Sequence, residues 1–338
     1  MALEMLPAEQ RERVRSALTA FGSSVAVAFE PVAGGASGAA LYMFEADGRS
    51  YALRLEGPRS PLRNPHQYAC MQIAADAGVA PRLHYVDAES GVAIMDFVRG
   101  EALAKYPGGP KELAAALGRI VAQLQEATRF PALHSYPALL ARMIETLCRP
   151  DFFAAGLLAP HRELFERIRE AYPWGGSALV SSHNDPNPQN VIFDGRRLWL
   201  IDWETAFCNE PLTDVAILAD NYARAPELES ALLEGWLGRA ADADTRARLS
   251  LMRVLSRLYY AGLLLGIGRA RAPRPGPDAD LGAPTPAEFG AAVAQGRLKA
   301  GSPEMLYTLG KMVLASFLKG AEASGFEDAL ATVRGSRA

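Results

Sequence analysis

The chain has 338 residues and a formal net charge of −3, and 49% of its residues are apolar. This length allows one or two domains, and the apolar content is enough for a substantial hydrophobic core. No run of five or more basic residues occurs, so the sequence lacks the electrostatic basis for binding nucleic acid or an anionic membrane surface. We therefore expect no nucleic-acid partner.

The cysteines and the apolar runs indicate the cellular compartment of the protein. Cys70, Cys148 and Cys208 lack the spacing of metal ligands, and such scattered cysteines are typical of reduced, buried residues. The N-terminal segment MALEMLPAEQRERVRSALTAFG predicts a charged amphipathic helix and not a signal peptide. The most apolar run, residues 258–268, is too short to span a bilayer. We expect a cytoplasmic protein with no membrane partner.

The N-terminal part of the chain alternates between strand-like and turn-like segments. The predicted strands are residues 24–32, 40–46, 50–57, 82–87 and 91–98. The pair Asp47-Gly48, between the second and third strands, is a strong β-hairpin signal. A helical pattern over residues 65–77 ends at Gly78. Together these elements predict a small antiparallel sheet with one helix.

Helical periodicity dominates the rest of the chain. The predicted helices are residues 111–128, 136–148 and 161–171, and further helices follow from residue 211 to the end. A Pro- and Gly-rich insert at residues 272–286 is either a disordered connection or a lid. We predict an α+β fold of two lobes: an N-terminal β lobe of residues 1–98 that includes the first helix, and a mostly helical lobe of residues 99–338.

The segment SSHNDPNPQN, residues 181–190, gathers polar side chains between two apolar runs. Its two prolines prevent a continuous helix or a central strand, so it is a fixed loop of the kind that often carries catalytic side chains. Two short strand patterns follow, joined by the turn DGRR. Pairing of these strands as a hairpin places Asn190 and Asp202 opposite each other at its open end, with Asp185 beside them.

An amide oxygen and a carboxylate in this arrangement are hard ligands that suit Mg²⁺. Asn190 and Asp202 are therefore the candidate metal ligands. Asp185, free of the metal, is the candidate catalytic base, because a carboxylate can accept the proton of a hydroxyl that attacks phosphorus. The alternative is that Asp185, Asn187 and Asn190 only cap turns, as Asp and Asn often do.

The motif H-x-D-x-x-x-x-N at residues 183–190 resembles that of the aminoglycoside phosphotransferase and choline kinase superfamily. The segment IDWETAFCNEPLTDVA is most similar to the bacterial choline/ethanolamine kinase branch, whose I-D-[FW]-E motif is followed twelve residues later by an Asp, here Asp214. The resemblance covers residues 24 to about 222. It implies a bilobal protein-kinase-like fold that uses ATP and Mg²⁺. It also implies that His183 braces the catalytic loop and that Asp214 positions it.

The resemblance also points to nucleotide-binding residues. In the segment VAGGASG, the backbone N–H groups of Gly34, Gly35, Ser37 and Gly38 can close over phosphates, although an ordinary flexible hairpin has the same composition. Arg54 occupies the position where protein kinases carry a phosphate-binding Lys. Its guanidinium can bind phosphate oxygens bidentately, unless it is a solvated strand residue.

The sequence departs from the family pattern around Arg54. The usual partner of this cation is a Glu on the following helix, but that helix lacks one and Gln67 stands near the expected place. Whether Arg54 has an acidic partner is left open. After the last strand of the β lobe, the backbone of Asp96, Phe97 and Val98 is expected to pair with an adenine edge.

The phosphate acceptor is indicated by charge and aromatic residues. Glu204, just past the predicted metal ligands, either faces a cationic group of the acceptor or holds the loop. With Asp214 and Asp220 it predicts a negative field, which favours a cationic acceptor over an anionic one. Tyr222 or Tyr259 can supply an aromatic wall for an ammonium group.

The sequence thus predicts an ATP- and Mg²⁺-dependent O-phosphotransferase that acts on a small hydroxylated acceptor. A cationic amino alcohol such as choline or ethanolamine is favoured. The alternatives are an aminoglycoside or sugar kinase of the same superfamily, and a catalytically weak nucleotide-binding protein with a kinase fold. The oligomeric state, monomer or homodimer, is left open.

Overall fold

The computed structural model describes residues 3, 6–22, 27–32, 39–57, 64–175 and 178–336. The strands are β1 (Glu30–Pro31), β2 (Ala40–Ala46), β3 (Arg49–Leu55), β4 (Leu83–Asp87), β5 (Val92–Asp96), β6 (Val180–Ser182), β7 (Val191–Phe193), β8 (Leu198–Leu200) and β9 (Phe207–Asn209). The α-helices are α1 (Ala8–Phe21), α2 (Gln67–Asp76), α3 (Gly109–Glu126), α4 (Tyr136–Leu147), α5 (Ala159–Ala171), α6 (Leu212–Tyr222), α7 (Pro226–Leu237), α8 (Ala243–Arg271), α9 (Pro286–Ala294), α10 (Pro303–Ala321) and α11 (Phe326–Gly335). Two short 3-10 helices are η2 (Leu103–Lys105) and η3 (Trp203–Thr205). These elements confirm the predicted α+β class.

The chain packs as two compact units, each discontinuous in sequence. The sheet unit comprises Met1–Leu133, Val180–Asn209 and Asn221–Ala240. The helical unit comprises His134–Leu179, Glu210–Asp220 and Ala241–Ala338. The division of the chain into lobes at residue 98 stays a prediction.

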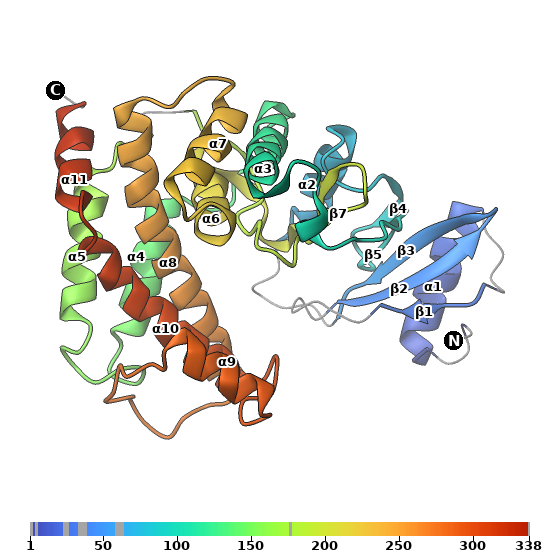
Figure 1. Ribbon diagram of the computed structural model, residues 1–338. Coiled ribbons are helices and arrows are strands. Elements are labelled where there is room, and N and C mark those ends of the chain that lie inside the picture. Colours follow the sequence, from blue (N-terminus) through green and yellow to red (C-terminus); the bar gives the residue numbers. More distant parts are fainter. Residues whose placement is uncertain are drawn as a thin grey trace. The chain divides into compact units, whose positions relative to one another are not determined.

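The first five strands form one antiparallel sheet, in the order β1-β2-β3-β5-β4. This confirms the predicted sheet (Figure 1). The β2–β3 hairpin closes at Asp47 and Gly48, whose φ angles of 50° and 71° are those of a type I′ turn. Within the described part of the first predicted strand, residues 27–32, the strand comprises Glu30–Pro31, which pair with β2, and is shorter than expected. Pro31 has no N–H for a sheet bond, which suits an edge position.

Helix α1 packs on this sheet and completes its core. Its residues Val14, Ala17 and Leu18 are buried against Phe44 and Leu53 of the sheet. Phe21, the last residue of α1, sits edge-on to Tyr51 with ring centroids 4.8 Å apart. The predicted N-terminal amphipathic helix therefore folds onto the sheet.

Helices α3 and α7 of the sheet unit run side by side at unusually close range (Figure 1). A Cβ atom at Gly118 of α3 would lie 2.2 Å from the carbonyl oxygen of Leu232. A Cβ atom at Gly235 of α7 would lie 2.1 Å from the carbonyl oxygen of Ala115. Only glycine fits at these two crossing points.

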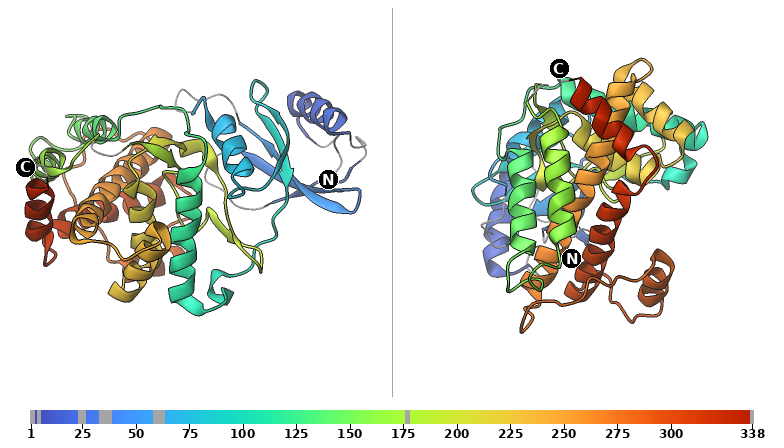
Figure 2. Two further views of the ribbon diagram at one scale, coloured as in Figure 1. Left: turned by 90° about the horizontal axis from the view of Figure 1, so that it is seen from above. Right: turned by 90° about the vertical axis from the view of Figure 1, so that its left-hand side faces the viewer.

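In the helical unit, α8 and α10 lie along each other (Figure 2). The Pro- and Gly-rich insert after α8 is held in place by Asp278. The backbone of Asp278 forms hydrogen bonds with the backbone of Phe152 and Ala154. The Asp278 carboxylate accepts hydrogen bonds from Lys311, at 2.7 Å, and Tyr307, at 3.1 Å. The insert is thus tied to α10 and to the chain between α4 and α5.

Helix α8 contains the apolar run that we considered too short to span a bilayer. Among the described residues it is the one helix long and apolar enough to do so, by length and composition alone. More than half of its most apolar stretch is buried inside the protein. A core helix meets the same criteria, so the hydropathy alone is weak evidence for a membrane span.

Candidate active site

The loop between β6 and β7 is built around Asn184. This residue has a φ of 63°, a left-handed conformation that Asn adopts more readily than most residues. Its amide oxygen accepts hydrogen bonds from Ser182 Oγ, at 3.0 Å, and Asn209 Nδ2, at 2.7 Å, while its Nδ2 donates to the carbonyl oxygen of Thr205 at 3.0 Å. Asn184 was not among the predicted site residues. Its signal in the sequence was an amide side chain inside the catalytic motif, between His183 and Asp185.

His183 is fully buried and braces the same loop. Its Nε2 donates to the carbonyl oxygen of Ile201 at 2.8 Å, and its ring lies 4.6 Å from that of Trp203. Burial lowers the pKa of His183 to about 4, so the ring is neutral at pH 7. These contacts agree with the loop-positioning role predicted for it.

Two asparagine side chains orient the carboxylate of Asp185. Asn187 Nδ2 donates to Asp185 Oδ1 at 2.9 Å. Asn190 Nδ2 donates to the Asp185 carbonyl oxygen at 2.9 Å and to its Oδ2 at 3.2 Å. Asp185 itself stays partly exposed. A carboxylate fixed in this way can receive a proton from solvent or from a bound hydroxyl.

The hairpin of β7 and β8 places the two predicted metal ligands at its open end. Val191 pairs with Leu200, and the N–H of Ile201 donates to the Asn190 carbonyl oxygen at 3.0 Å. Asp202 is the next residue and has a φ of 66°, a conformation that costs a non-glycine residue about 1 kcal/mol and often marks a functional site. The structure therefore brings Asn190, Asp202 and Asp185 to one place.

These side chains are suited to a magnesium ion. Among the described residues, the buried Asp202 Oδ1 accepts no hydrogen bond. Asn190 uses its amide nitrogen on Asp185, which leaves its amide oxygen for another partner. In the described part of the chain, no group of three or more His, Cys, Asp or Glu residues is arranged to hold a metal ion by itself. Mg²⁺, however, often takes one or two protein ligands and completes its shell with water and phosphate.

Glu204 lies on η3, just after Asp202. Burial raises the pKa of Glu204 to about 7, and the charges of Asp202 and Asp185 push it the same way. The charge of Arg54 opposes this effect. Burial also raises the pKa of Asp202, again against Arg54. The site thus concentrates carboxylates around one arginine.

Arg54 has an acidic partner, and it is not on the helix. Arg54 Nη1 donates to Glu56 Oε1 at 3.0 Å, and both side chains are only 10% exposed. The hydroxyl of Tyr68, on α2, lies 3.5 Å from the same nitrogen. Burial works against the charge of Arg54, but Tyr68, Asp202 and Glu56 raise its pKa. The sequence left the acidic partner of Arg54 open, and in the structure that partner is Glu56 and not a residue of the helix.

Of the three residues whose backbone is expected to pair with adenine, two already donate hydrogen bonds within the sheet unit. The N–H of Asp96 donates to the Arg82 carbonyl oxygen and the N–H of Phe97 to that of Ser50, at 2.9 and 3.1 Å. In the described part of the chain no such bond involves Val98. Val98 therefore has the freest backbone of the three. The predicted phosphate loop residues Gly34, Gly35, Ser37 and Gly38 lie outside the described residues.

The remaining predicted acceptor residues lie mostly in the helical unit. Asp214 is fully buried near the start of α6. The positioning of the catalytic loop by Asp214 stays a prediction. Asp220 is bound by Arg253 Nε at 2.7 Å and Arg257 Nε at 2.9 Å. These two cations neutralise it, which corrects the expectation that Asp220 adds to a negative field. Tyr259 is 6% exposed and packs with other rings inside that unit.

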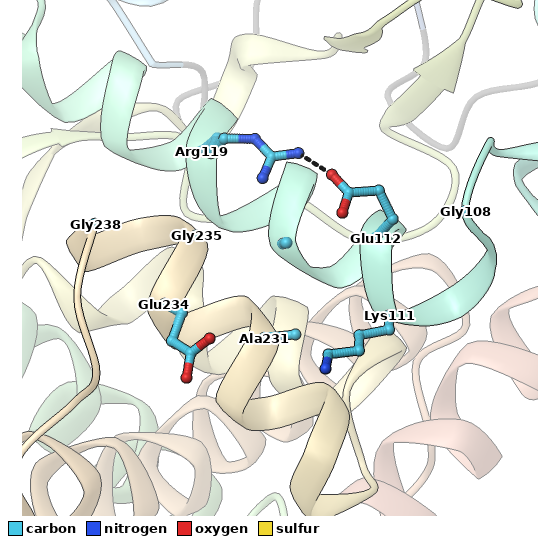
Figure 3. A pocket seen from close by; sticks show the side chains of 9 residues that line it. Gly108, Lys111, Glu112, Arg119, Ala231, Glu234, Gly235 and Gly238 are labelled. Carbon is cyan, nitrogen blue, oxygen red and sulfur yellow. Dashed lines mark hydrogen bonds and ion pairs between the residues drawn. The ribbon is translucent and has the colours of Figure 1, made fainter.

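A surface pocket of about 600 Å³ opens between α3 and α7 (Figure 3). It is lined by Lys111, Glu112 and Arg119 from α3 and by Glu234 from α7, and Glu112 pairs with Arg119. Its cations and acids balance. None of the described site residues lines this pocket.

Comparison with known proteins agrees with this geometry. The model of the phosphotransferase enzyme family matches residues 28–251. Protein LicA of Haemophilus influenzae is 38% identical over 56 residues, which are 17% of this chain and 21% of that protein. The chain therefore matches only about a fifth of the length of this relative.

Solved structures share the fold, and two of them illustrate it. A choline/ethanolamine kinase family protein from Mesorhizobium loti superposes with a TM-score of 0.66 at 21% identity, over 91% of this chain and 92% of that chain. The choline kinase LicA from Streptococcus pneumoniae superposes with a TM-score of 0.61 at 15% identity, over 91% of this chain and all of that chain. Both identities are low, so these likenesses establish the kinase-like fold alone.

Proposed function

The chain belongs to the phosphotransferase enzyme family, and on that premise we propose that it is an ATP- and Mg²⁺-dependent kinase of a small hydroxylated acceptor. The observation that carries the proposal is the arrangement at the open end of the β7–β8 hairpin. Asp185 is oriented by Asn187 and Asn190, and Asp202 lies within the electrostatic reach of Arg54. Positioning and charge stabilisation are what phosphoryl transfer requires of a protein.

In the proposed reaction, the acceptor oxygen forms a bond to the γ-phosphorus of ATP while the bond from that phosphorus to the ADP oxygen breaks. Asp185 takes the proton of the attacking hydroxyl. Arg54 would bind phosphate oxygens, and Asn190 and Asp202 would hold the metal. Bound Mg²⁺ would supply charge neutralisation on the phosphate oxygens.

We propose an amino alcohol of the choline or ethanolamine type as the acceptor. The similarity of the I-D-W-E segment to the choline/ethanolamine kinase branch supports it. Glu204 adds an acid beside the proposed base. We also propose that the protein works in the cytoplasm, where ATP and Mg²⁺ are available.

The test is a product screen with the purified full chain, Mg²⁺, ATP and a mixture of amino alcohols, sugars, aminoglycosides and acidic hydroxyl compounds. Mass spectrometry identifies any compound that gains a phosphoryl group, and ADP release gives its rate. We expect phosphocholine or phosphoethanolamine as the main product. If an uncharged or acidic compound is phosphorylated and amino alcohols are not, the proposed acceptor is wrong. The proposed kinase activity would still stand. Nucleotide binding without any turnover would support a nucleotide-binding protein instead.

A further inference from the structure

The cation and the acid at the proposed nucleotide site come from one strand. Arg54 lies on β3, and Glu56 follows two residues later, just after the end of that strand. The Glu56 N–H donates to the Gly91 carbonyl oxygen at 2.9 Å, so the backbone stays paired as in the sheet. Residues two apart in a strand point to the same face. Their 3.0 Å ion pair is therefore set by the strand itself.

The surroundings hold Glu56 in this position. Gly91 has a φ of 69°, and a Cβ atom there would lie 3.0 Å from Glu56 Cβ and 3.1 Å from its Oε2. Arg13 Nη2, from α1, donates to the carbonyl oxygens of both Glu56 and Gly91 at 3.3 Å. The backbone of Glu56 is thus fixed from two sides and its side chain has little free space.

Helix α2 contributes no acid to this pair. Its first turn has no acidic residue. Gln67 at its start is 2% exposed, and in the described structure its Nε2 makes no hydrogen bond. Tyr68 reaches Arg54 only through its hydroxyl, at 3.5 Å. The acid of this ion pair therefore comes from the end of β3 and not from α2.

We propose that Glu56 is a positioning residue for the nucleotide, which holds Arg54 toward the phosphates and away from Asp202. This inference rests on the proposed function. The charge of Asp202 acts on Arg54, so without the charge of Glu56 the guanidinium would turn toward Asp202. There it would compete with the metal for the same carboxylate. Phosphate binding would weaken, while adenine binding would not change.

The experiment compares the affinities of wild type and Glu56→Gln for ATP and for adenosine by calorimetry, with Mg²⁺ and without acceptor. Gln keeps a hydrogen-bond acceptor but removes the charge, so we expect ATP to bind about tenfold more weakly. Adenosine, which has no phosphate, should bind within about twofold of wild type. Glu56→Asp keeps the charge and should recover part of the ATP affinity. Glu45→Gln, an exposed acid on β2, is the matched control and should change neither affinity.

Three results would overturn the inference. Unchanged ATP affinity in Glu56→Gln would mean that Arg54 needs no acid to face the phosphates. An equal loss for ATP and adenosine would mean that Glu56 only supports the fold. Failure of the wild type to bind either compound would overturn the proposed function, and this inference with it. If Glu56→Gln does not fold, the Glu56→Asp variant is the test. The inference then requires this variant to bind ATP more weakly than wild type does and to bind adenosine equally well.

Discussion

At the scale of single residues, the orientation of Asp185 depends on two amides that follow it in the chain. Asn187 donates to one carboxylate oxygen and Asn190 to the other. Both donors are short side chains within the same loop, so their geometry changes little when the rest of the protein moves. The second amide, Asn190, is also one of the two candidate metal ligands, so one residue would link the proposed base to the proposed metal site.

Asp185→Asn should therefore slow turnover strongly without unfolding the protein. The new amide can still accept one of the two hydrogen bonds, but it cannot take a proton. We expect kcat to fall by about 10²-fold or more, the usual scale for a lost general base. ATP affinity should stay near the wild-type value. Steady-state kinetics and nucleotide titration check this, with the exposed Asp76→Asn on α2 as control. Near-normal turnover would exclude Asp185 as the base.

The site could be predicted from the sequence where its residues lie close together along the chain. Asp185 and Asn190 share a loop, and a hairpin brings Asp202 to them, so local patterns were sufficient. Glu56 was missed as the partner of Arg54, although the two-residue period of a strand places both on one face. The pairing of Asp220 with two arginines of α8 depends on tertiary packing, for which one sequence carries no local signal.

At the scale of elements, glycine sets how closely α3 and α7 approach. At Gly118 and Gly235 an added methyl group would meet a backbone carbonyl of the other helix at little more than 2 Å. A backbone atom cannot rotate away as a side chain can. The helices would have to separate, and the packing along both would loosen.

Gly235→Ala should accordingly destabilise the protein by about 2 kcal/mol or more. The matched control is Gly266→Ala in α8, where an added Cβ meets nothing within 4 Å. There the substitution should leave stability unchanged or raise it by up to about 1 kcal/mol, because Ala favours helix. Urea unfolding of the two variants measures both effects. A Gly235→Ala variant as stable as wild type would show that the helix pair can shift without cost.

Most elements were predictable because their signals are local. The Asp47-Gly48 turn fixed the β2–β3 hairpin, and Gly78 follows α2 with a φ of 73°, as a helix-ending glycine should. The first strand was predicted too long because its apolar pattern continues beyond the pairing with β2. Phe29 is buried by α1 and the sheet without being part of a strand. Burial, and not sheet pairing, accounts for its apolar character.

At the scale of the whole molecule, each unit buries a neutral histidine. His183 lies in the sheet unit and His161 in the helical unit, where its ring stacks on Phe317 at 6.2 Å. Burial lowers the pKa of both to about 4. Protonation of either ring would place a charge in an apolar environment, which the folded state resists.

This predicts a loss of stability in mild acid. An unfolded histidine titrates near pH 6.5, whereas folded His161 titrates near pH 4, so the unfolded state binds more protons between these values. The contribution of His161 is complete above pH 6.5. It then falls by about 1.4 kcal/mol per pH unit until pH 4. Urea unfolding at pH 7.5, 6.5 and 5.5 measures the slope. His161→Leu should flatten it by that amount, because the titrating group is gone. His66→Leu, at a partly exposed histidine, is the control. Equal slopes in wild type and His161→Leu would mean that His161 binds a proton as readily in the folded protein as in the unfolded one.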